Sequence, residues 1–251
     1  HALKSRGLQV FSNDHNAYSA TLARCYVEAD RERVERDARA LIDELARLPG
    51  RAGYFTETFC VKSRFFQPKN GERIDAIREE IARKALDPLL EAVLLVSLME
   101  AADRVDSTVG VQMAYLKQWA PRAAKELSLR FPDVLPASAH GSCRATQRDA
   151  ADAVRELAAD VVYLDPPYNQ HSYLGNYHVW ESLVLWDKPE VYGVACKRVD
   201  VRSRKSGFNL KPRFKDALAD VVKHAQCRVL VVSFNNEGYI ARPEMEAMLA
   251  E

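Results

Sequence analysis

The chain has 251 residues, of which 36 are Lys or Arg and 35 are Asp or Glu, so its formal net charge at pH 7 is +1. This near-neutrality excludes a globally basic protein, and any nucleic-acid-binding face must be a local patch. The five cysteines are odd in number and include no Cys-x-x-Cys pair, which argues against both a disulfide framework and a zinc site. No apolar run approaches the roughly 20 residues that span a bilayer, and no signal peptide is visible. We therefore expect a soluble cytoplasmic protein without a metal or a membrane partner.

The first predicted elements are a helix end, a short strand and an acidic turn. Residues 1–6 are typical of the last turn of a helix, which Gly7 closes in a left-handed conformation, and residues 8–12 are typical of a strand. Asp14 follows at the tip of this strand. In nucleotide-binding βαβ units an acidic residue at such a tip accepts hydrogen bonds from ribose hydroxyls. The alternative is that Asp14 or Asn16 only caps the helix that starts near Tyr18.

A mostly helical region follows. Residues 17–48 carry apolar side chains at spacings of three and four, which predicts a helix. Residues 54–73 interleave aromatic with basic and amide side chains. Such residues either stack bases and contact phosphates or form an aromatic core with a basic rim. Helices are predicted at 74–85 and 88–102, and the second is apolar nearly all round, so we expect it to be buried.

Two polar segments lead into the second half of the chain. The loop 105–119 carries Gln112 and Lys117, whose side chains are typical contacts of adenine edges and of phosphates. We therefore place this loop in a DNA-facing part of the protein. Asp149 precedes a helix predicted at 150–157, where an N-cap is the simplest role for Asp149 or for its neighbour Asp152.

The most specific motif is a short apolar strand, predicted as buried at 160–165, that stops at Asp165-Pro166-Pro167-Tyr168. Because proline cannot donate to a sheet ladder, both prolines must lie beyond the end of the strand. Asp165 then lies at the carboxyl edge, where open α/β sheets bind their ligands. A carboxylate, a carbonyl fixed by proline and the flat face of Tyr168 form a suitable cradle for a planar ring that bears an amino group. The alternative is a surface Asp in a proline-rich turn.

The rest of the chain adds a helix, a basic stretch and a strand. In the helix predicted near 177–186, His178 has no second His or Cys at helical spacing, so it is interpreted as a hydrogen-bonding residue and not as a metal ligand. Residues 197–215 carry Lys or Arg at eight of nineteen positions, which predicts a phosphate-binding surface, with a solvated loop as the alternative. A buried strand at 228–234 ends at two asparagines, and a last helix follows.

The segment Asp165-Pro166-Pro167-Tyr168 resembles the motif of the S-adenosylmethionine-dependent DNA amino-methyltransferases in their adenine-specific form, and the order of segments resembles the Dam-like class. The runs at 176–178 and 230–239 are also similar to this family. The resemblance implies an α/β fold, namely a doubly wound, Rossmann-like methyltransferase sheet with a mostly helical inserted domain.

The same resemblance implies a division of the chain into domains. Residues 1–27 would be part of the cofactor and catalytic domain, residues 28–135 a helical insert that recognises the target, and residues 136–251 the catalytic part. In this family a first strand and a Gly-bearing loop precede the segment with which the numbered chain begins. We therefore expect the cofactor domain to be incomplete at its N-terminus.

The resemblance also implies a role for each functional residue. The catalytic residues are Asp165, Pro166, Pro167 and Tyr168. The residues expected to bind S-adenosylmethionine are Asn13, Asp14, Asp149 and Asp165. The residues expected to contact duplex DNA, from which the target base flips out, are Arg64, Lys69, Lys117, Tyr173, Asn176, Lys197, Arg198, Arg202, Arg204 and Lys205. A cognate restriction endonuclease is a potential partner, and we expect a monomer.

Three alternatives remain open. The nearest is methylation of the N4 amine of cytosine, whose enzymes more often have Ser at the position of Asp165. A second is methylation of RNA or of a protein glutamine, in relatives that more often have Asn there and lack a large insert. The third is a DNA-binding fragment that is inactive because the cofactor loop is absent.

Overall fold

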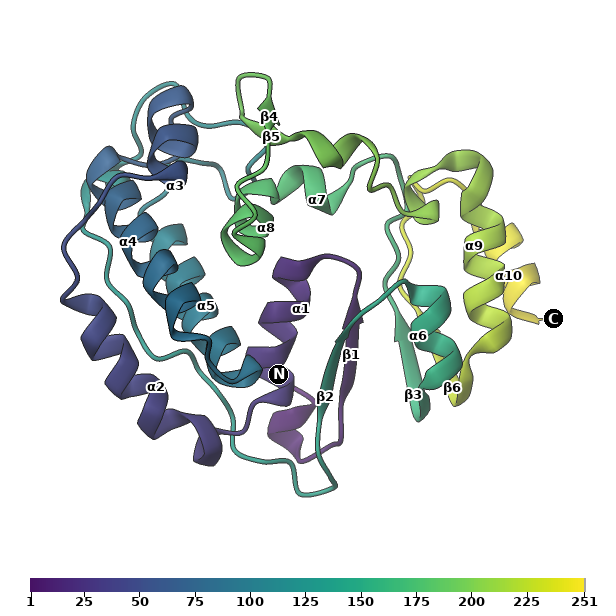
Figure 1. The fold of residues 1–251 in the computed structure, drawn as a ribbon. Helices are drawn as coiled ribbons and strands as arrows, with labels where there is room; N and C mark the ends of the chain where they lie inside the picture. The colour runs from purple at the N-terminus through teal and green to yellow at the C-terminus, as the bar shows by residue number, and fades with distance from the viewer. Residues whose placement is uncertain (251) are drawn as a thin grey trace. The chain divides into compact units, whose positions relative to one another are not determined.

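The computed structural model describes residues 1–250 and divides into two compact units, which we describe separately (Figure 1). Unit 1 comprises residues 1–147 and 177–199, and unit 2 comprises residues 148–176 and the chain from Asp200 onward. The domain boundaries expected from the family resemblance stay a prediction.

The helices and strands of unit 1 form a helical bundle beside a pair of parallel strands. Its helices are α1 (Ala17–Ala23), α2 (Arg31–Ala46), α3 (Tyr54–Thr56), α4 (Pro68–Lys84), α5 (Pro88–Asp103) and α8 (His178–Leu185). Its strands are β1 (Phe11–Asp14), β2 (Arg144–Gln147), β4 (Val191–Tyr192) and β5 (Lys197–Arg198). Short 3-10 turns lie at Lys4–Arg6 and Pro121–Ala124, and π-helical turns at Arg24–Glu28 and Glu57–Lys62.

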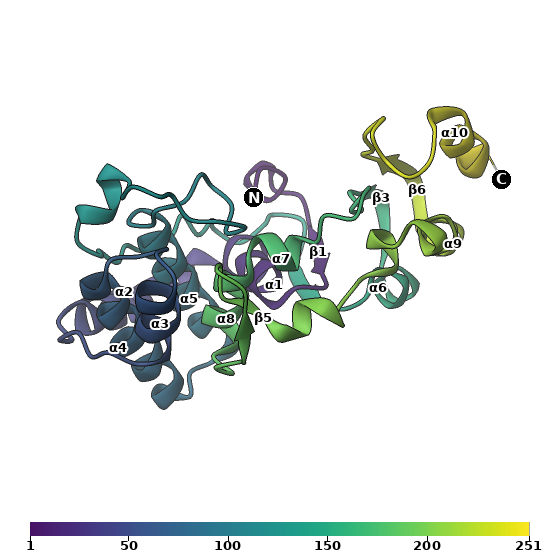
Figure 2. The same ribbon diagram turned by 90° about the horizontal axis from the view of Figure 1, so that it is seen from above.

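The core of unit 1 lies among α2, α4 and α5, which pack side by side (Figure 2). Helix α5 is the apolar helix expected at 88–102, and ten of its side chains are buried. Asp87 caps its N-terminus by accepting the amide of Leu89 at 3.0 Å. The aromatic residues of 54–73 belong to this core, because Phe55, Phe59 and Phe65 are fully buried. The core alternative for these rings is therefore the correct one.

The single helix expected over residues 17–48 is interrupted. After α1 and a π-helical turn, the backbone of Ala29 and Asp30 is extended before α2 begins. The buried Lys4 fills this break, because its ammonium donates to the Ala29 carbonyl at 2.7 Å and pairs with the Asp30 carboxylate at 2.8 Å. Apolar periodicity continues across the break, so the sequence pattern alone hides it.

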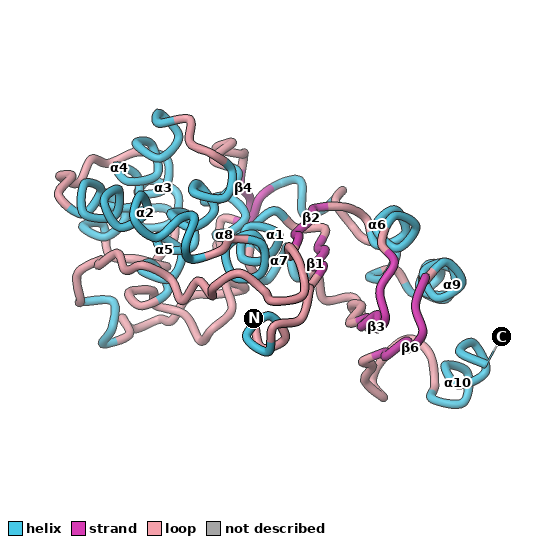
Figure 3. Tube along the Cα trace, turned by 90° about the horizontal axis from the view of Figure 1, so that it is seen from below, coloured by secondary structure: helices cyan, strands magenta, loops and turns pink. Residues whose placement is uncertain are grey.

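Unit 2 contains a second parallel strand pair with helices against it. Its elements are α6 (Ala150–Glu156), β3 (Ala158–Leu164), α7 (Tyr173–Asn176), α9 (Lys211–His224), β6 (Gln226–Val232) and α10 (Arg242–Ala250). Strands β3 and β6 run parallel, with Leu164 opposite Val232 at their carboxyl ends. Helices α6 and α9 lie along one side of the pair (Figure 3). A small apolar core packs on that side, and α9 contributes most of its helical residues, with Val154 from α6 and Met245 from α10.

The other face of the β3–β6 pair differs from the prediction of a buried strand. Val161 and Tyr163 on β3 and Val229 and Val231 on β6 are all exposed, while Leu164 and Val232 pack on the core. A continuous apolar run is typical of a strand covered on both faces, but only one face of this pair is covered within the described residues. The burial prediction was wrong for that face.

The expected α/β class is confirmed, whereas one continuous sheet is not observed. In the described residues the strands form three separate pairs, β1–β2 and β3–β6 parallel and β4–β5 antiparallel. Strand β2, which pairs with β1 from Phe11 opposite Arg144 to Asp14 opposite Gln147, was not predicted.

Candidate functional site

The candidate catalytic segment lies at the carboxyl ends of β3 and β6 in unit 2. Strand β3 ends at Leu164, and the Ser233 amide donates to the Leu164 carbonyl at 2.8 Å, which holds the two strand ends together. Asp165 is the next residue and is exposed. Its carboxylate makes no hydrogen bond or ion pair with any residue of the described chain. The motif thus presents a free acceptor at the edge predicted for it.

Tyr168 lies beside an open hollow at the same edge. Its ring packs edge-on against Phe234, with ring centroids 6.2 Å apart and planes at 75°. The hollow has a volume of about 570 Å³ and is lined by Tyr168, Ser233, Phe234, Asn235 and Asn236. Sequence reasoning placed the two asparagines at a strand end but assigned them no role in the site. A parallel arrangement of the two strands would have predicted a role for them, because it brings the ends of both strands to one edge of the sheet.

In unit 1, Asp14 ends β1, and its carboxylate organises the turn into α1. One oxygen accepts the Asn16 amide at 2.8 Å, and the other accepts the Ser19 hydroxyl at 2.7 Å. The helix-capping alternative holds only in part, because Asn16 is the N-cap residue of α1 but its side chain makes no capping hydrogen bond, and Asp14 orders the preceding turn. Each carboxylate oxygen has a second lone pair, so this role leaves Asp14 able to accept further donors. Asn13 accepts the Thr146 hydroxyl at 2.8 Å, which ties β1 to β2.

The N-terminus of α1 is also held by a buried glutamate that sequence reasoning left without a role. Glu181 on α8 is completely buried, and its carboxylate accepts the amides of Ala17 at 3.2 Å and Tyr18 at 2.9 Å. A carboxylate at a helix N-terminus satisfies amides that have no partner within the helix and interacts favourably with the helix dipole. Glu181 therefore fixes the direction in which α1 leaves the turn at Asp14.

Asp149 is an N-cap in the structure. Its carboxylate accepts the Ala151 amide at 2.9 Å at the start of α6 and is otherwise exposed. Only one of its two oxygens is used by this cap, so a further role remains open to the other.

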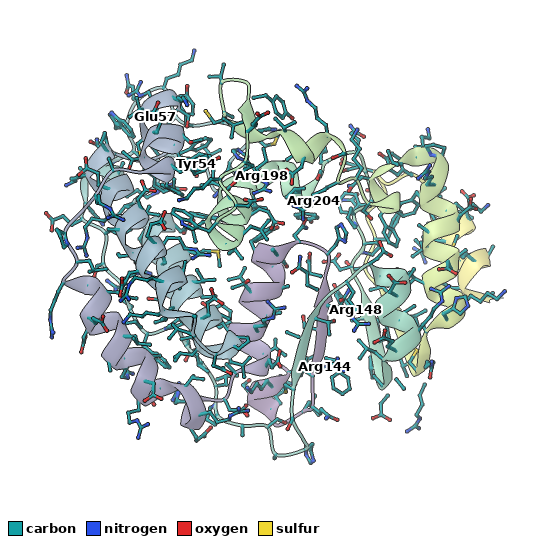
Figure 4. The ribbon with its side chains drawn as sticks, viewed as in Figure 1. Tyr54, Glu57, Arg144, Arg148, Arg198 and Arg204 are labelled. Carbon is teal, nitrogen blue, oxygen red and sulfur yellow. The ribbon has the colours of Figure 1, made fainter. Side chains whose placement is uncertain are left out.

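The prediction that Arg198 contacts DNA is wrong. Its side chain is 2% exposed, and its guanidinium forms two 2.7 Å hydrogen bonds to the Asp187 carboxylate. Figure 4 labels Arg198 on the segment that carries β5, inside unit 1. A run of basic residues in sequence does not reveal that one member turns inward, and this one stabilises the fold.

The other expected DNA contacts lie at or near the surface. Lys205, Arg202, Lys117 and Tyr173 are exposed. Arg64 and Lys69 are also exposed, although Arg64 donates to the Lys117 carbonyl at 3.1 Å and Lys69 to the Ala124 carbonyl at 2.9 Å. The members that are only partly exposed are Asn176, Lys197 and Arg204.

A second open hollow, in unit 1, is lined by basic, acidic and apolar residues. It has a volume of about 890 Å³, and its basic lining residues are Arg104, Arg122, Lys125 and Arg130. The buried Asp106 pairs with Arg122 and accepts the Thr108 hydroxyl at 2.6 Å, which fixes the loop at the rim of this hollow. This is the loop that the sequence placed in a DNA-facing part.

His178 is a buried hydrogen-bonding residue, as predicted. Its Nε2 lies 3.0 Å from the Gln112 carbonyl, while the Gln112 side chain accepts the Val179 amide at 3.0 Å. The pKa of His178 is lowered to about 4, chiefly by burial and also by the nearby Lys197 and Arg198, while the hydrogen bond to the Gln112 carbonyl opposes the shift. Across residues 1–250, no group of three or more His, Cys, Asp or Glu side chains could hold a metal ion. None of the helices over the same residues is long and apolar enough to cross a membrane.

These features define a class of site: a free carboxylate and a proline carbonyl beside an aromatic ring, at the carboxyl end of a parallel strand. The chain matches the family model of the D12 class N6 adenine-specific DNA methyltransferases over residues 1–236, so it belongs to that family. This confirms the resemblance inferred from the Asp-Pro-Pro-Tyr motif.

Curated relatives agree with this family. The chain is 34% identical to the type II methyltransferase M.FokI of Planomicrobium okeanokoites, over 74% of this chain and 29% of that protein. It is 32% identical to the type II methyltransferase M.NlaIII of Neisseria lactamica, over 95% of this chain and 72% of that protein. For M.CviAII of Paramecium bursaria Chlorella virus 1 the identity is 28%, over 79% and 60%. The chain thus spans less than a third of M.FokI but most of M.NlaIII. No solved structure matches the chain significantly.

Proposed function

We propose that the protein containing this chain transfers a methyl group from S-adenosylmethionine to the N6 amine of a flipped adenine at specific sites in duplex DNA. The observation that carries this proposal is the free Asp165 carboxylate at the tip of β3, next to Tyr168 and its open hollow. Family membership supports adenine as the base and DNA as the polymer.

The adenine amine is a poor nucleophile because its lone pair is delocalised into the ring. Hydrogen bonds from its two N–H groups to the Asp165 carboxylate and the Pro166 carbonyl would localise that lone pair on nitrogen. Such preorganised acceptors lower a barrier without moving during the reaction. When bound, S-adenosylmethionine would supply the methyl group: the amine lone pair would form the new bond to the methyl carbon, the electrons of the carbon–sulfur bond would stay with sulfur, and the amine would give one proton to solvent.

Tyr168 would support the flipped base. Extruding a base from a duplex costs a few kcal/mol, and stacking on an aromatic ring returns about 1–3 kcal/mol per base. The edge-on contact with Phe234 keeps the Tyr168 ring in place while leaving room in the hollow beside it.

The hydrogen-bond acceptors of Asp14 in unit 1 fit the nucleoside part of S-adenosylmethionine. Asp14 ends a parallel strand, and each of its carboxylate oxygens retains a lone pair that can accept a ribose hydroxyl. Asp149 and Asn13 are the further residues that we propose for this cofactor. The two parallel strand pairs, each with a carboxylate at a carboxyl end, support a Rossmann-like methyltransferase fold.

We propose that exposed basic residues, Lys205 and Arg202 among them, contact the DNA backbone. The relatives are named type II methyltransferases and modification methylases, which supports a bacterial restriction–modification role with a cognate endonuclease. Such a protein would act as a monomer on the DNA of the nucleoid.

The test is mass spectrometry of nucleosides from duplex DNA incubated with the full-length protein and its cofactor. We expect N6-methyladenine from the parent protein and none above background from Asp165→Ala, with DNA binding retained. Asp160→Ala is the matched control, because Asp160 is an exposed carboxylate on the same strand, away from the motif; it should behave as the parent. N4-methylcytosine as the product, methylation by Asp165→Ala, or no methylation by the parent protein would each overturn the proposal.

A further inference from the structure

The side chain of Asn209 holds the loop that follows the catalytic motif. Asn209 lies in unit 2 at the end of a 3-10 turn (Gly207–Asn209) and is 9% exposed. Its amide nitrogen donates to the Asn169 carbonyl at 3.1 Å and to the His171 carbonyl at 3.2 Å. Because both partners are carbonyls, the side-chain nitrogen and not the oxygen must face the loop.

A tyrosine extends this contact to the motif itself. The Tyr239 hydroxyl donates to the Asn209 carbonyl at 3.1 Å, and the Tyr239 amide donates to the Tyr168 carbonyl at 3.1 Å. Three of the four carbonyls from Tyr168 to His171 are therefore held by two residues. The Tyr239 ring packs edge-on against Phe214 in the core, with centroids 5.7 Å apart, so the holding group is itself anchored.

The backbone next to Asn209 is also held by the core of unit 2. Phe208, the residue before it, is buried in the small core of unit 2, and the Ser206 hydroxyl accepts the Phe208 amide at 3.3 Å. The loop, by contrast, contains no helix or strand between Leu164 and Tyr173 and exposes Gln170 and His171. Its only internal side-chain bond is the His171 amide to the Asn169 side chain at 2.9 Å. The loop thus takes its conformation largely from Asn209 and Tyr239.

We propose that Asn209 is a positioning residue for base entry, because it fixes the loop 168–171 so that Tyr168 meets a flipped adenine in one orientation. This inference rests on the proposed function. Asn209 touches neither the base nor the cofactor in this scheme, and it acts only through the loop. Since backbone phosphates supply most of the affinity for a duplex, loss of Asn209 should impair the chemical step and the stacking of the base more than the binding of DNA.

Asparagine is well matched to this role. Its short side chain offers two hydrogens from one nitrogen, which is what two neighbouring carbonyls require. Asp at this position would place carboxylate oxygens against carbonyl oxygens, and Leu would keep the size but leave two carbonyls without their donor. A misplacement of about 1 Å in a reacting group can lower a rate by about 100-fold.

The test compares Asn209→Leu, Asn209→Asp and Tyr239→Phe in the full-length protein. Tyr239→Phe keeps the ring against Phe214 and removes only the hydroxyl. Gln170→Ala is the matched control, because Gln170 is exposed on the same loop and its side chain has no hydrogen bond in residues 1–250. The measurements are kcat, KM for a target duplex, the urea midpoint, and the fluorescence of 2-aminopurine at the target adenine, which reports stacking of the flipped base.

We expect Asn209→Leu and Asn209→Asp to lower kcat by about 10- to 100-fold, with KM within about twofold of the parent and an altered 2-aminopurine signal. Tyr239→Phe should show a smaller effect in the same direction, and Gln170→Ala none. Unchanged kcat in a folded Asn209 variant would overturn the inference. So would losses of kcat that only follow the folded fraction while the 2-aminopurine signal of the bound duplex stays that of the parent. If the Asn209 variants do not fold, Tyr239→Phe decides by the same criteria. A parent protein that does not methylate adenine would instead refute the proposed function.

Discussion

The ion pair between the buried Arg198 and Asp187 predicts that removing either partner lowers stability by a different amount. The Arg198 side chain is 2% exposed, whereas that of Asp187 is 44% exposed. Asp187→Ala would leave a buried guanidinium without its carboxylate, which costs about 3–5 kcal/mol. Arg198→Met would keep much of the buried volume and leave a carboxylate that water can reach. It should therefore cost only about 1.5–3 kcal/mol, the range for a hydrogen bond to a charged group.

Variants of this pair also test whether Arg198 stabilises the fold or contacts DNA. Urea unfolding gives the stabilities, and binding of a labelled duplex between about 50 and 200 mM salt gives the slope of log K against log salt concentration. Arg198→Met should leave that slope unchanged, while Lys205→Ala, at an exposed position of the same basic stretch, should reduce it by about 0.9 for the lost phosphate contact. A structural role for Arg198 would be refuted if Arg198→Met kept the parent stability but reduced the salt slope, or if Arg198→Met destabilised the protein more than Asp187→Ala.

Three further predictions follow from buried or stacked groups. Burial lowers the pKa of His178 to about 4 from its ordinary 6.5, so the unfolded chain takes up a proton first as the pH falls. The free energy of unfolding should be highest above about pH 6.5 and fall by about 3 kcal/mol towards pH 4. His178→Leu should lack this part of the pH dependence in urea unfolding. The same pH dependence in the parent and in His178→Leu would contradict the role given to His178. Asp75→Asn should lower the free energy of unfolding by about 2–4 kcal/mol, because the buried Asp75 carboxylate accepts from three amides and a hydroxyl at the start of α3; a parent-like urea midpoint would argue against it. Tyr168→Ala should reduce kcat more than duplex affinity, because stacking of the flipped base is lost, and equal losses in both would speak against a stacking role.

Features with a local physical cause could be predicted from the sequence. Gly7 closes the first turn with a positive φ of 79°, and Pro88 lies just inside the start of α5, as each residue type favours. The strand before Asp165 ends where the prolines require it to end. The position of the candidate catalytic segment was therefore predictable, although the burial of its strand was not.

Features that depend on residues distant in sequence were missed. Apolar periodicity cannot show that Lys4 fills a break at Ala29, because that contact joins two separate elements. An apolar strand does not tell whether one or both of its faces will be covered. A cluster of basic residues in the sequence likewise does not reveal which side chains are buried, and nothing in the sequence distinguishes Arg198 from its exposed neighbours.

The pairing of β1 with β2 also has a consequence for how the chain folds during synthesis. Partners such as Asn13 and Thr146 are 133 residues apart. At roughly 5–20 residues per second, the ribosome delivers the second strand about 7–27 s after the first. Helices α2, α4 and α5, which contact one another, are all synthesised before β2 and can therefore pack in that interval. Strand β1, with its exposed Phe11, has no strand partner until β2 is synthesised. During this time its unpaired backbone can aggregate or bind chaperones.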